Sequence, residues 1–600
     1  MMAALIQRLR EWIGVFGKRS LRDFRPRKDL AAREQMTMLL FASVVGLAVG
    51  YAAYGFRELL SLIQYLFYGE YSEFMVAAVS RLAWWHVLLA PALGGLLLAL
   101  FLKYLMPGGR AQGVADVIEA GMYHDGRMSF RTGLGAAFAS ALSIGAGASV
   151  GREGPLVHLG GSLAGIITKK MRLSRVDGHS VLACGVAAGV AASFNAPIAG
   201  VIFAHEVVLG HYALRALAPV VISAVIGTIV TRIHIGDFPA FLVPEYAISN
   251  FWNFPAFMLL GLVSGLIALI FFWSVAVAKD SFDTLRIPEF WRPPVAGLAV
   301  GCIALLFPQV LGVGYEATDN ALKQLYPLHI LILLVAAKMA ATAISIAGGF
   351  GGGVFSPALF LGAMTGGAFG LIAASIFPEV ALDHGLYAIV GMGAVASAVL
   401  GAPISTTLIV FELTGDYRVT IAMMAAVVLA AILGRQFKFR SFFHWQLARR
   451  AVKLAAADEV LLHEQIVADV MDSNVMTISP GMSFAELRAL YRDSNAQAYF
   501  LVDEEGCIAG ALNETDVKYA LLDPDLDDLG RAVDIASASG PLLTPDMPLD
   551  EAMTAFSGTA YRFLAVVDSA DERHLLGIVR FRDVLAAHNK ALKMAREETQ

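Results

Sequence analysis

Two charged residues stand next to each other inside an apolar stretch. Arg152 and Glu153 are the centre of GREGP (151–155), with GASV before it and LVHLGGSLAGII after it. Glycines let backbone N–H groups approach a ligand, and a proline near a helix start is preorganised for it. A helix beginning here within a membrane would direct free N–H groups and a positive dipole end at an anion, with Glu153 at that same end. The alternative is that Glu153 only pairs with Arg152 for structure.

A second glycine-rich segment, GGFGGGVFSP (348–357), has a matching character. A glycine in a helix interior costs about 1 kcal/mol relative to alanine, so this run is a poor helix. We interpret it as an extended approach to another helix N-terminus near Ser356–Pro357. The alternative is a close helix-packing seam.

These two segments belong to a faint internal repeat. GREGPLVHLG (151–160) aligns with GVFSPALFLG (353–362), which puts Phe355 in the place of Glu153. Two halves with matching Gly/Pro-interrupted apolar segments indicate a pseudo-symmetric transporter fold with its site at the repeat interface. Glu153 and Phe355 should therefore converge near the pseudo-symmetry axis. We expect an inverted repeat, although the pattern alone does not distinguish an inverted from a parallel one.

The repeat continues downstream. Glu206 follows Pro197 by nine residues, and Glu412 follows Pro403 by nine residues, each after an NAPI or GAPI segment. Glu412 is expected to cap or brace the end of its own helix.

Membrane helices must position these residues. The chain is 57% hydrophobic and only 16% charged, whereas soluble proteins have nearer a quarter charged residues. Runs such as 39–56, 86–102 and 254–273 are apolar and long enough for a hydrocarbon core. Basic residues are concentrated in 1–35 and again from Arg435 onward, so both ends of this multi-pass membrane part should face the cytosol.

The composition then changes to that of a soluble α/β region. We expect a cytosolic N-terminal segment, a membrane domain, a linker helix, two α/β repeats and a short tail, with these bounds: 1–35, 36–440, 441–466, 467–527, 528–590 and 591–600. The two repeats share landmarks in order and spacing, such as YFLVDEEG with FLAVVDSA, and resemble a CBS-domain pair.

GREGP, GVFSP, SFNAPIAGVIF and VFELTGDY (410–417) together resemble the CLC family of chloride channels and transporters over about residues 40–450. The resemblance implies an all-α membrane domain with broken helices, chloride or a related anion as the transported ion, and a homodimer in the lipid bilayer. It also implies that Glu153 is the gating glutamate and that the amides of Val354 and Phe355 hold the central anion. Arg152 and Gly154 of GREGP complete the expected motif.

Three positions depart from the family pattern. Gln112 stands where the family has a serine, and Phe443 stands where it has a tyrosine whose hydroxyl contacts the anion; Phe offers no donor. Both are expected to line the anion site. Antiporter members carry a proton-transferring glutamate as the second of two acids; here Glu206 matches the first and Val207 replaces the second. Glu206 or His205 remains a candidate proton relay.

Other polar residues in the apolar runs receive weaker interpretations. His158 and His205 are expected to be hydrogen-bonded core residues, and Lys338 to form a structural ion pair or to influence the pore potential. The cysteines have no metal-ligand spacing, and we expect no metal site.

A passive anion channel is the leading function and a proton-coupled chloride antiporter its alternative. A CBS-regulated cation transporter would need clustered intramembrane acids, and an intramembrane enzyme would need a catalytic motif that these runs lack. No nucleic-acid partner and no firm cofactor are expected. Asp516 and Asp583 each end a G-x-x-x-x-x-D segment that could bind an adenine nucleotide, although Asn513 and Arg580 replace its usual small hydroxyl residue. The alternative is a purely structural, dimerising tail.

Overall fold

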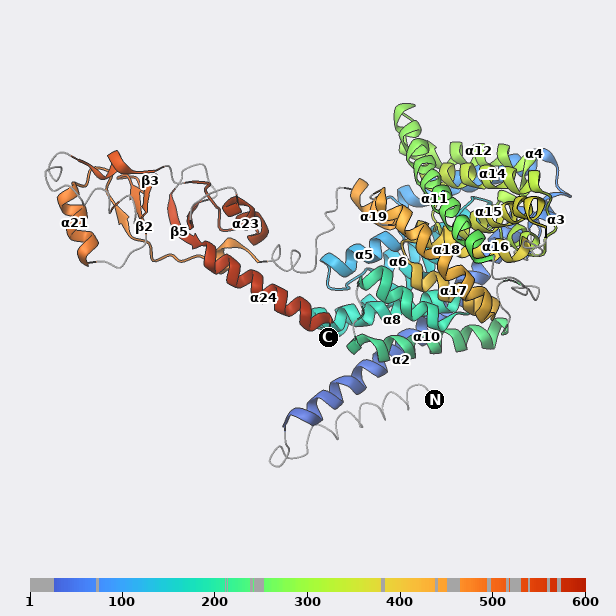
Figure 1. The fold of residues 1–600 in the computed structure, drawn as a ribbon, viewed down its shortest axis with the longest axis horizontal. Coiled ribbons are helices and arrows are strands. Elements are labelled where there is room, and N and C mark those ends of the chain that lie inside the picture. The colour runs from blue at the N-terminus through green and yellow to red at the C-terminus, as the bar shows by residue number, and fades with distance from the viewer. Residues whose placement is uncertain are drawn as a thin grey trace. The chain divides into compact units, whose positions relative to one another are not determined.

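The computed structural model describes residues 26–599 except for 72–74, 211, 213, 238–240, 242–252, 379–383, 438–440, 451–464, 494–497, 514–516, 518–529, 538–539, 558–561 and 569–573. The chain forms two compact units, Met1–Phe443 and His444–Gln600. In the described residues the first unit is helical, whereas the second combines short strands with helices (Figure 1). This confirms the expected combination of a helical membrane domain and an α/β region.

The described helices between residues 26 and 449 range from a single short turn to 43 residues, and the last of them, α19, continues into the second unit. They are α2 (Pro26–Tyr68), α3 (Met75–Val79), α4 (Trp84–Tyr104), α5 (Val114–Tyr123), α6 (Phe130–Gly145), α7 (Glu153–Met171), α8 (Arg175–Phe194), α9 (Pro197–Phe203), the π-helix η1 (Ala204–Leu209), α10 (Leu214–Ile235), α11 (Asn253–Thr284), the 3₁₀ turn η2 (Glu289–Trp291), α12 (Arg292–Leu306), the 3₁₀ turn η3 (Pro308–Val310), α13 (Tyr315–Leu322), α14 (Leu328–Ala347), α15 (Phe355–Ile376), α16 (His384–Leu400), α17 (Pro403–Thr414), α18 (Tyr417–Gln436) and α19 (Phe442–Arg449).

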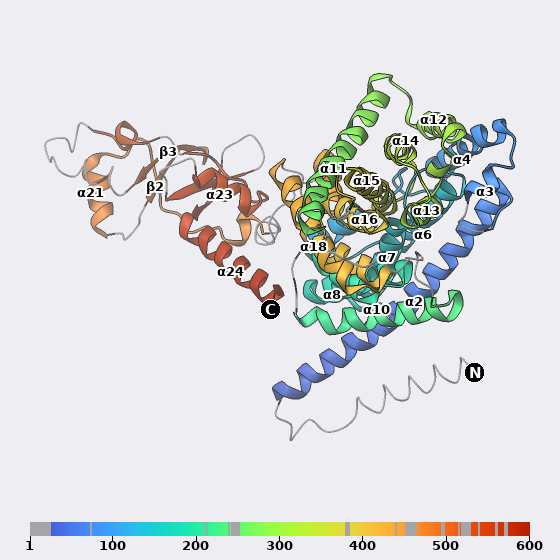
Figure 2. The same ribbon diagram turned by 45° about the vertical axis from the view of Figure 1, so that its right-hand side comes forward.

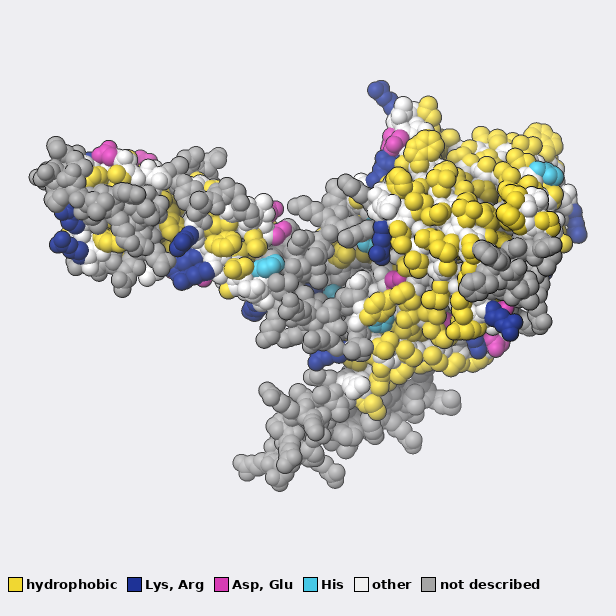
Figure 3. All heavy atoms as spheres, in the orientation of Figure 1, with side chains coloured by type: hydrophobic (Ala, Val, Ile, Leu, Met, Phe, Trp, Pro, Cys, Tyr) yellow, Lys and Arg dark blue, Asp and Glu magenta, His cyan; other side chains and the backbone are white. Residues whose placement is uncertain are grey.

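Nine of the described helices are long and apolar enough to cross a membrane, with spans of 18 to 34 residues. They are α2, α4, α8, α10, α11, the η2–α12 segment, α14, α15 and α18. A helix of about 20 residues covers the hydrocarbon thickness. Their outer faces carry exposed large hydrophobic side chains, such as Leu259, Leu266 and Trp273 of α11. Figure 3 shows hydrophobic side chains covering this face of the helical unit, as a lipid-facing surface requires.

Matching glycines bring matching helix pairs together in the two halves. A Cβ built on Gly185 of α8 would lie 2.2 Å from the carbonyl oxygen of Gly160 of α7. In the second half, a Cβ on Gly391 of α16 would lie 2.5 Å from the carbonyl oxygen of Gly362 of α15. Both pairs therefore pack backbone against backbone, and Figure 2 shows α15 and α16 side by side within the unit. The repeat seen in the sequence is thus a repeat of helix packing.

The described part of the second unit contains two small sheets. In the first, β1 (Thr477–Ile478) pairs in parallel with β2 (Ala498–Val502), which pairs antiparallel with β3 (Ile508–Asn513). In the second, β4 (Phe563–Val567) pairs antiparallel with β5 (Leu575–Arg580). The accompanying helical elements are η4 (Val467–Asp469), α21 (Phe484–Asp493), η6 (Ala532–Ile535), α23 (Leu549–Ser557) and α24 (Phe581–Thr599).

The two strand–helix modules share part of their core. Phe500 and Ala511 of the first module pack in one buried cluster with Ala565, Val567 and Ile578 of the second. Most of the expected linker helix lies outside the described residues, and α19 covers its first part.

Candidate functional site

The glycine-rich segments meet at the ends of two helices. Gly151 and Gly353 exchange two backbone hydrogen bonds, each 2.7 Å long, as one antiparallel bridge. Directly after this bridge α7 begins at Glu153 and α15 begins at Phe355, both buried. A Cβ on Gly154 would come within 3.1 Å of the Cα of Gly353. The two backbones can approach this closely because neither residue has a side chain. This confirms that both segments lead into helix N-termini that converge.

The paired N-termini open onto a small cavity. Its walls are largely apolar, and its free volume of about 10 Å³ has room for roughly one water molecule. It is lined by Val114, Glu153, Gly154, Val157, Val190, Phe194, Phe203, Gly353, Val354, Phe355 and Phe443. The first N–H groups of a helix have no partner within the helix and carry its positive dipole end, so this place favours a single small anion.

Five of the residues expected at an anion site therefore share one cavity: Glu153, Gly154, Val354, Phe355 and Phe443. Sequence reasoning missed the apolar walls from other helices, such as Phe194 of α8 and Phe203 of α9. The ring centroids of Phe194 and Phe355 are 4.8 Å apart.

The Glu153 carboxylate is almost completely enclosed, with 2% of the residue exposed. Its Oε1 accepts hydrogen bonds from the Tyr315 hydroxyl at 2.9 Å and from the Ser356 hydroxyl at 2.5 Å. Its Oε2 has no hydrogen-bond partner among the described residues. Ser356 could have been noticed in GVFSP as a hydroxyl directly after Phe355, but Tyr315, at the start of α13, carried no local signal.

Arg152 is directed at other groups. Its Nη2 donates to the carbonyl oxygen of Ser193 at 3.5 Å, and its guanidinium lies 4.8 Å from the centroid of the Tyr315 ring. The hydrogen bonds to the Glu153 carboxylate come from hydroxyl groups. Glu153 as the gate, and the alternative that it only pairs with Arg152 for structure, both stay predictions.

Gln112 lines a second cavity, next to His158. Its Oε1 is 3.0 Å from Nε2 of the fully buried His158, and both line a polar cavity of about 210 Å³ with Arg110 and Asp116. Gln112 is not among the residues that line the Glu153 cavity; Val114, two residues later, is. His158 is hydrogen-bonded as expected of a core residue, and Gln112 as an anion ligand stays a prediction.

The two repeated glutamates cap each other's helices. Glu206 accepts hydrogen bonds from the backbone N–H groups of Ile404 at 3.1 Å and Ser405 at 2.7 Å, in the first turn of α17. Glu412 accepts from Ile198 at 3.1 Å and Ala199 at 2.7 Å, in the first turn of α9. This reciprocity is what a two-fold relation between the halves produces.

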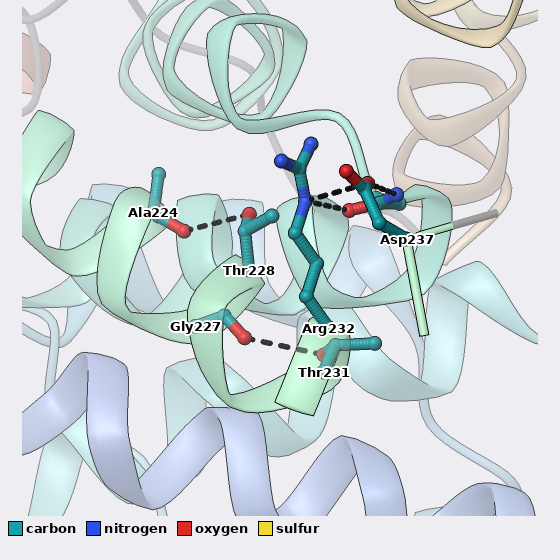
Figure 4. Close-up of polar contacts among 7 residues, drawn as sticks. Ala224, Gly227, Thr228, Thr231, Arg232 and Asp237 are labelled. Carbon is teal, nitrogen blue, oxygen red and sulfur yellow. Dashed lines mark hydrogen bonds and ion pairs between the residues drawn. The ribbon is translucent and has the colours of Figure 1, made fainter. Parts of the chain in front are cut away.

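The expectation that Glu412 caps its own helix is therefore wrong. Its carboxylate crosses to the α8–α9 corner of the other half. There Arg232 Nε donates to Asn195 Oδ1 at 2.7 Å and lies 3.1 Å from Asp237 Oδ1 (Figure 4). Asn195 ends α8 in the left-handed conformation, with φ of 59°, so this polar cluster holds the corner that presents the amides of α9 to Glu412.

The residues around Glu206 form a π-helix, η1, which sets this half apart from the other. Four positions separate Glu206 from the positive-φ Gly210, whereas three separate Glu412 from the positive-φ Gly415. The wider turn of η1 accommodates this extra residue. Within η1, His205 Nδ1 is 2.9 Å from the carbonyl oxygen of Val201, and Val207 is buried.

Lys338 binds backbone carbonyl groups and has no ion pair among the described residues, whereas its influence on the pore potential stays a prediction. Its Nζ donates to the carbonyl oxygens of Val310 at 3.0 Å and Gly312 at 2.9 Å, and it lies 5.1 Å from the Phe360 ring centroid. It is fully buried and fixes the loop that leads into α13. The loop in turn sets the position of Tyr315.

Only part of the proposed nucleotide site can be described. Asp516 lies outside the described residues. Asp583 is in the first turn of α24, half-buried, 3.5 Å from Arg582. Arg580 pairs with Asp472 at 2.7 Å.

A membrane unit of two repeated halves, with helix N-termini converging on a buried glutamate, defines a class of anion-transport protein. Comparison with known proteins gives the family. The model for voltage gated chloride channels matches residues 94–435, more than half of the 600 residues, and the chain belongs to this family. The CBS domain model matches residues 467–523 and 534–590.

Several relatives and solved structures are similar over most of their own length. A ClcB-like chloride channel protein of Ralstonia nicotianae is 34% identical over 69% of this chain and 97% of its own length. The voltage-gated ClC-type chloride channel ClcB of Escherichia coli is 31% identical over 69% of this chain and 99% of its own length.

Among solved structures, a slow cyanobacterial Cl⁻/H⁺ antiporter has a TM-score of 0.62 at 25% identity, covering 70% of this chain and 98% of its own. A eukaryotic CLC transporter has a TM-score of 0.61 at 19% identity, covering 91% of this chain and 98% of its own, which shows a shared fold.

Proposed function

We propose that this protein conducts chloride passively across a membrane and that Glu153 is its gate. The observation that carries the proposal is the convergence of the α7 and α15 N-termini on a cavity with room for one small particle beside the Glu153 carboxylate. Relatives named as chloride channels at 31–34% identity support chloride as the ion.

The gate follows from competition between two negative charges. An ionised Glu153 and a chloride would both be stabilised by the same helix N-termini, and two anions repel each other in a medium of low dielectric constant. Protonation removes the charge of the carboxylate and leaves the N-termini to the ion. Flux should therefore rise as pH falls.

The environment of Glu206 supports a passive channel. Both carboxylate oxygens of Glu206 bind the amides of α17, and the next residue, where antiporters of the family have a proton-transferring glutamate, is the buried Val207. A coupled cycle needs a titratable relay between the cytosol and Glu153, and valine does not carry a proton.

A proton-coupled chloride antiporter is the second candidate, because His205 offers a different relay. It is 1% exposed, and its Nε2 has no hydrogen-bond partner among the described residues. Its ring stacks on that of Tyr212, with centroids 6.1 Å apart. An imidazole ring can accept a proton on one nitrogen and release one from the other, which suits a relay.

Flux in proteoliposomes separates these candidates. Chloride efflux is followed with an electrode while external pH is recorded under an imposed chloride gradient. A channel gives chloride flux that rises on acidification, with no sustained uphill proton movement. Glu153→Gln should give the acid-activated flux at every pH; unchanged flux and pH dependence in this variant would falsify the gate. Uphill proton movement that His205→Ala abolishes would make the protein an antiporter.

We further propose that the CBS pair binds an adenine nucleotide through Asp583. The ion pair between Arg580 and Asp472 supports nucleotide binding, because it holds the Arg580 guanidinium at the Asp472 carboxylate. Calorimetry of the full-length protein with ATP, ADP and AMP tests it, with Asp583→Ala as the variant that should lose binding. Absence of heat at millimolar nucleotide favours a structural tail.

A homodimer with both termini in the cytosol completes the proposal. The basic residues that flank the membrane domain support this orientation. The neighbouring helices α9 and α17 expose Ile198 and Ile404, each by at least 50%, as an apolar surface for a second copy. Light scattering of the detergent-solubilised protein gives the oligomeric state, and labelling of cysteines added at each terminus gives the orientation.

A further inference from the structure

We propose that the hydroxyl groups of Tyr315 and Ser356 hold the ionised Glu153 and so set the pH at which the pathway opens. We call these two groups the hydroxyl pair. The proposal rests on Glu153 being the gate, and it assigns a role to two residues outside the expected anion-binding set.

Both hydroxyls reach the same carboxylate oxygen. Tyr315 Oη is 2.9 Å and Ser356 Oγ 2.5 Å from Glu153 Oε1, and all three residues are at least nine-tenths buried. A carboxylate accepts hydrogen bonds, and its ionised form accepts them more strongly than its protonated form. Two donors on one oxygen therefore stabilise the charged, blocking state of the gate relative to the neutral, open state.

The side chain of Tyr315 is held in place by contacts other than its hydrogen bond to Glu153. Its ring packs edge-on against Phe241, with centroids 5.1 Å apart, and the Arg152 guanidinium lies 4.8 Å from the centroid of the Tyr315 ring. The residue before it, Gly314, has φ of 86°, which turns the chain into α13. A donor held in this way need not reorganise to bind the carboxylate, so the full strength of the hydrogen bond acts on the gate.

The proton has a distinct place to bind. Glu153 Oε2 has no hydrogen-bond partner among the described residues, and it lies beside Gly151, where a built Cβ would be only 2.7 Å away. A proton added to Oε2 turns the carboxylate into a neutral carboxyl group while Oε1 still faces the hydroxyl pair. To open the pathway, Glu153 Oε1 must give up its hydrogen bonds from Tyr315 and Ser356. This costs less free energy for the neutral carboxyl group, because it accepts these hydrogen bonds more weakly than the carboxylate does.

The charged and titratable groups around the gate remain in place when the hydroxyls are removed. Arg152 precedes Glu153 on its own helix, and Lys338 of α14 lies beside Gly314 at the start of α13. Among the described residues, the cavity neighbours from α5, α8, α9 and α19 are all apolar: Val114, Val190, Phe194, Phe203 and Phe443. A shift in the pH dependence on removing a hydroxyl therefore reports on the hydroxyl itself.

The test is chloride efflux from proteoliposomes between pH 4 and 9 for Tyr315→Phe, Ser356→Ala and the double variant. Each lost hydroxyl should move the pH of half-maximal flux upward by about one unit, equivalent to about 1.4 kcal/mol. Ser356→Thr, which keeps a hydroxyl, should stay close to the wild-type midpoint. Matched controls are Tyr387→Phe and Ser397→Ala, because both hydroxyls are buried and unpartnered among the described residues; neither should move it.

The same variants in a Glu153→Gln background separate the hydroxyl pair from the gate. If Tyr315→Phe and Ser356→Ala raise the midpoint of the wild-type protein, Glu153→Gln removes the pH dependence, and Tyr315→Phe causes no further change in the Glu153→Gln background, both proposals hold. If Glu153→Gln removes it but the single variants leave the wild-type midpoint unmoved, or lower it, the hydroxyl pair is refuted and the gate stands. If Glu153→Gln changes nothing, the gate itself fails. Should Tyr315→Phe not fold, Ser356→Ala with its Thr rescue decides the question alone.

Discussion

The reciprocal glutamate caps yield a prediction with a built-in control. Glu206 and Glu412 each receive one N–H bond of 3.1 Å and one of 2.7 Å at the first turn of the other half's helix. If both are caps, equivalent substitutions should have equivalent effects. If Glu206 is instead a proton relay, only its substitution should change proton movement.

The expected magnitude follows from the two bonds. A hydrogen bond to a charged group contributes about 1.5–3 kcal/mol, and a cap replaced by alanine costs about 0.5–2 kcal/mol. Both carboxylates are half-buried, so water replaces part of the loss. We expect Glu206→Ala and Glu412→Ala each to lower the free energy of unfolding by about 2–4 kcal/mol. The Gln variants, which keep one acceptor oxygen, should lose about half as much.

Thermal unfolding in detergent, followed by tryptophan fluorescence, measures these changes as lower midpoints, by about 2–5 °C for the alanine variants. The same proteins in liposomes report chloride and proton movement. The reasoning is refuted if Glu206→Gln keeps wild-type stability while it alone abolishes proton movement. It also fails if the two alanine variants differ greatly in midpoint, because the backbone hydrogen bonds to the two glutamates have the same lengths.

Three further predictions concern packing and pH. Gly185→Ala should prevent α8 from packing on α7 and abolish folded protein on gel filtration, whereas Gly55→Ala, with nothing within 4 Å of its Cβ, should be neutral or gain up to about 1 kcal/mol. Tyr68→Phe removes the 2.9 Å bond to the carbonyl after α6 and should lower unfolding free energy by about 1–2 kcal/mol in denaturant titration. Hydrogen bonds from Ser483 lower the pKa of Glu486. The contact therefore stabilises α21 at pH values above about 4.3, the usual pKa of a glutamate carboxyl group, and this stabilisation is lost as the pH falls further. The protection of the α21 amides from hydrogen exchange, relative to their intrinsic rates at each pH, should fall on acidification, and less so in Ser483→Ala, where the contact is already weakened.

The parts of the site that could be predicted are those with a local cause. Glycine runs, prolines and a charge within apolar sequence required α7 and α15 to begin near Glu153 and Phe355, and they do. The repeat was visible in the sequence because both halves need glycines at matching positions, where two helix backbones pack against each other. The fold class followed from the same apolar and α/β patterns.

The parts that could not be predicted depend on contacts far along the chain. Tyr315 meets Glu153 across 162 residues, and no local pattern marks it. The hydrogen bond between Gln112 and His158 joins residues 46 positions apart and likewise has no local signal. The Glu412 carboxylate, near the end of α17, accepts hydrogen bonds from the unpaired amides at the start of α9 in the other half. The spacing of residues along α17 does not reveal this contact with another helix.

The reciprocal caps also have a consequence for how the chain is made. The amides of Ile198 and Ala199 are completed by a carboxylate 214 and 213 residues later. At synthesis rates of about 5–20 residues per second, the first half waits roughly 10–40 s in the membrane before Glu412 is made. During that interval α9 has an uncapped end, and Glu206 carries a charge without its amides. The nascent first half is thus an incomplete folding unit, and a ribosome that stops before Glu412 releases a product that quality-control proteases can recognise.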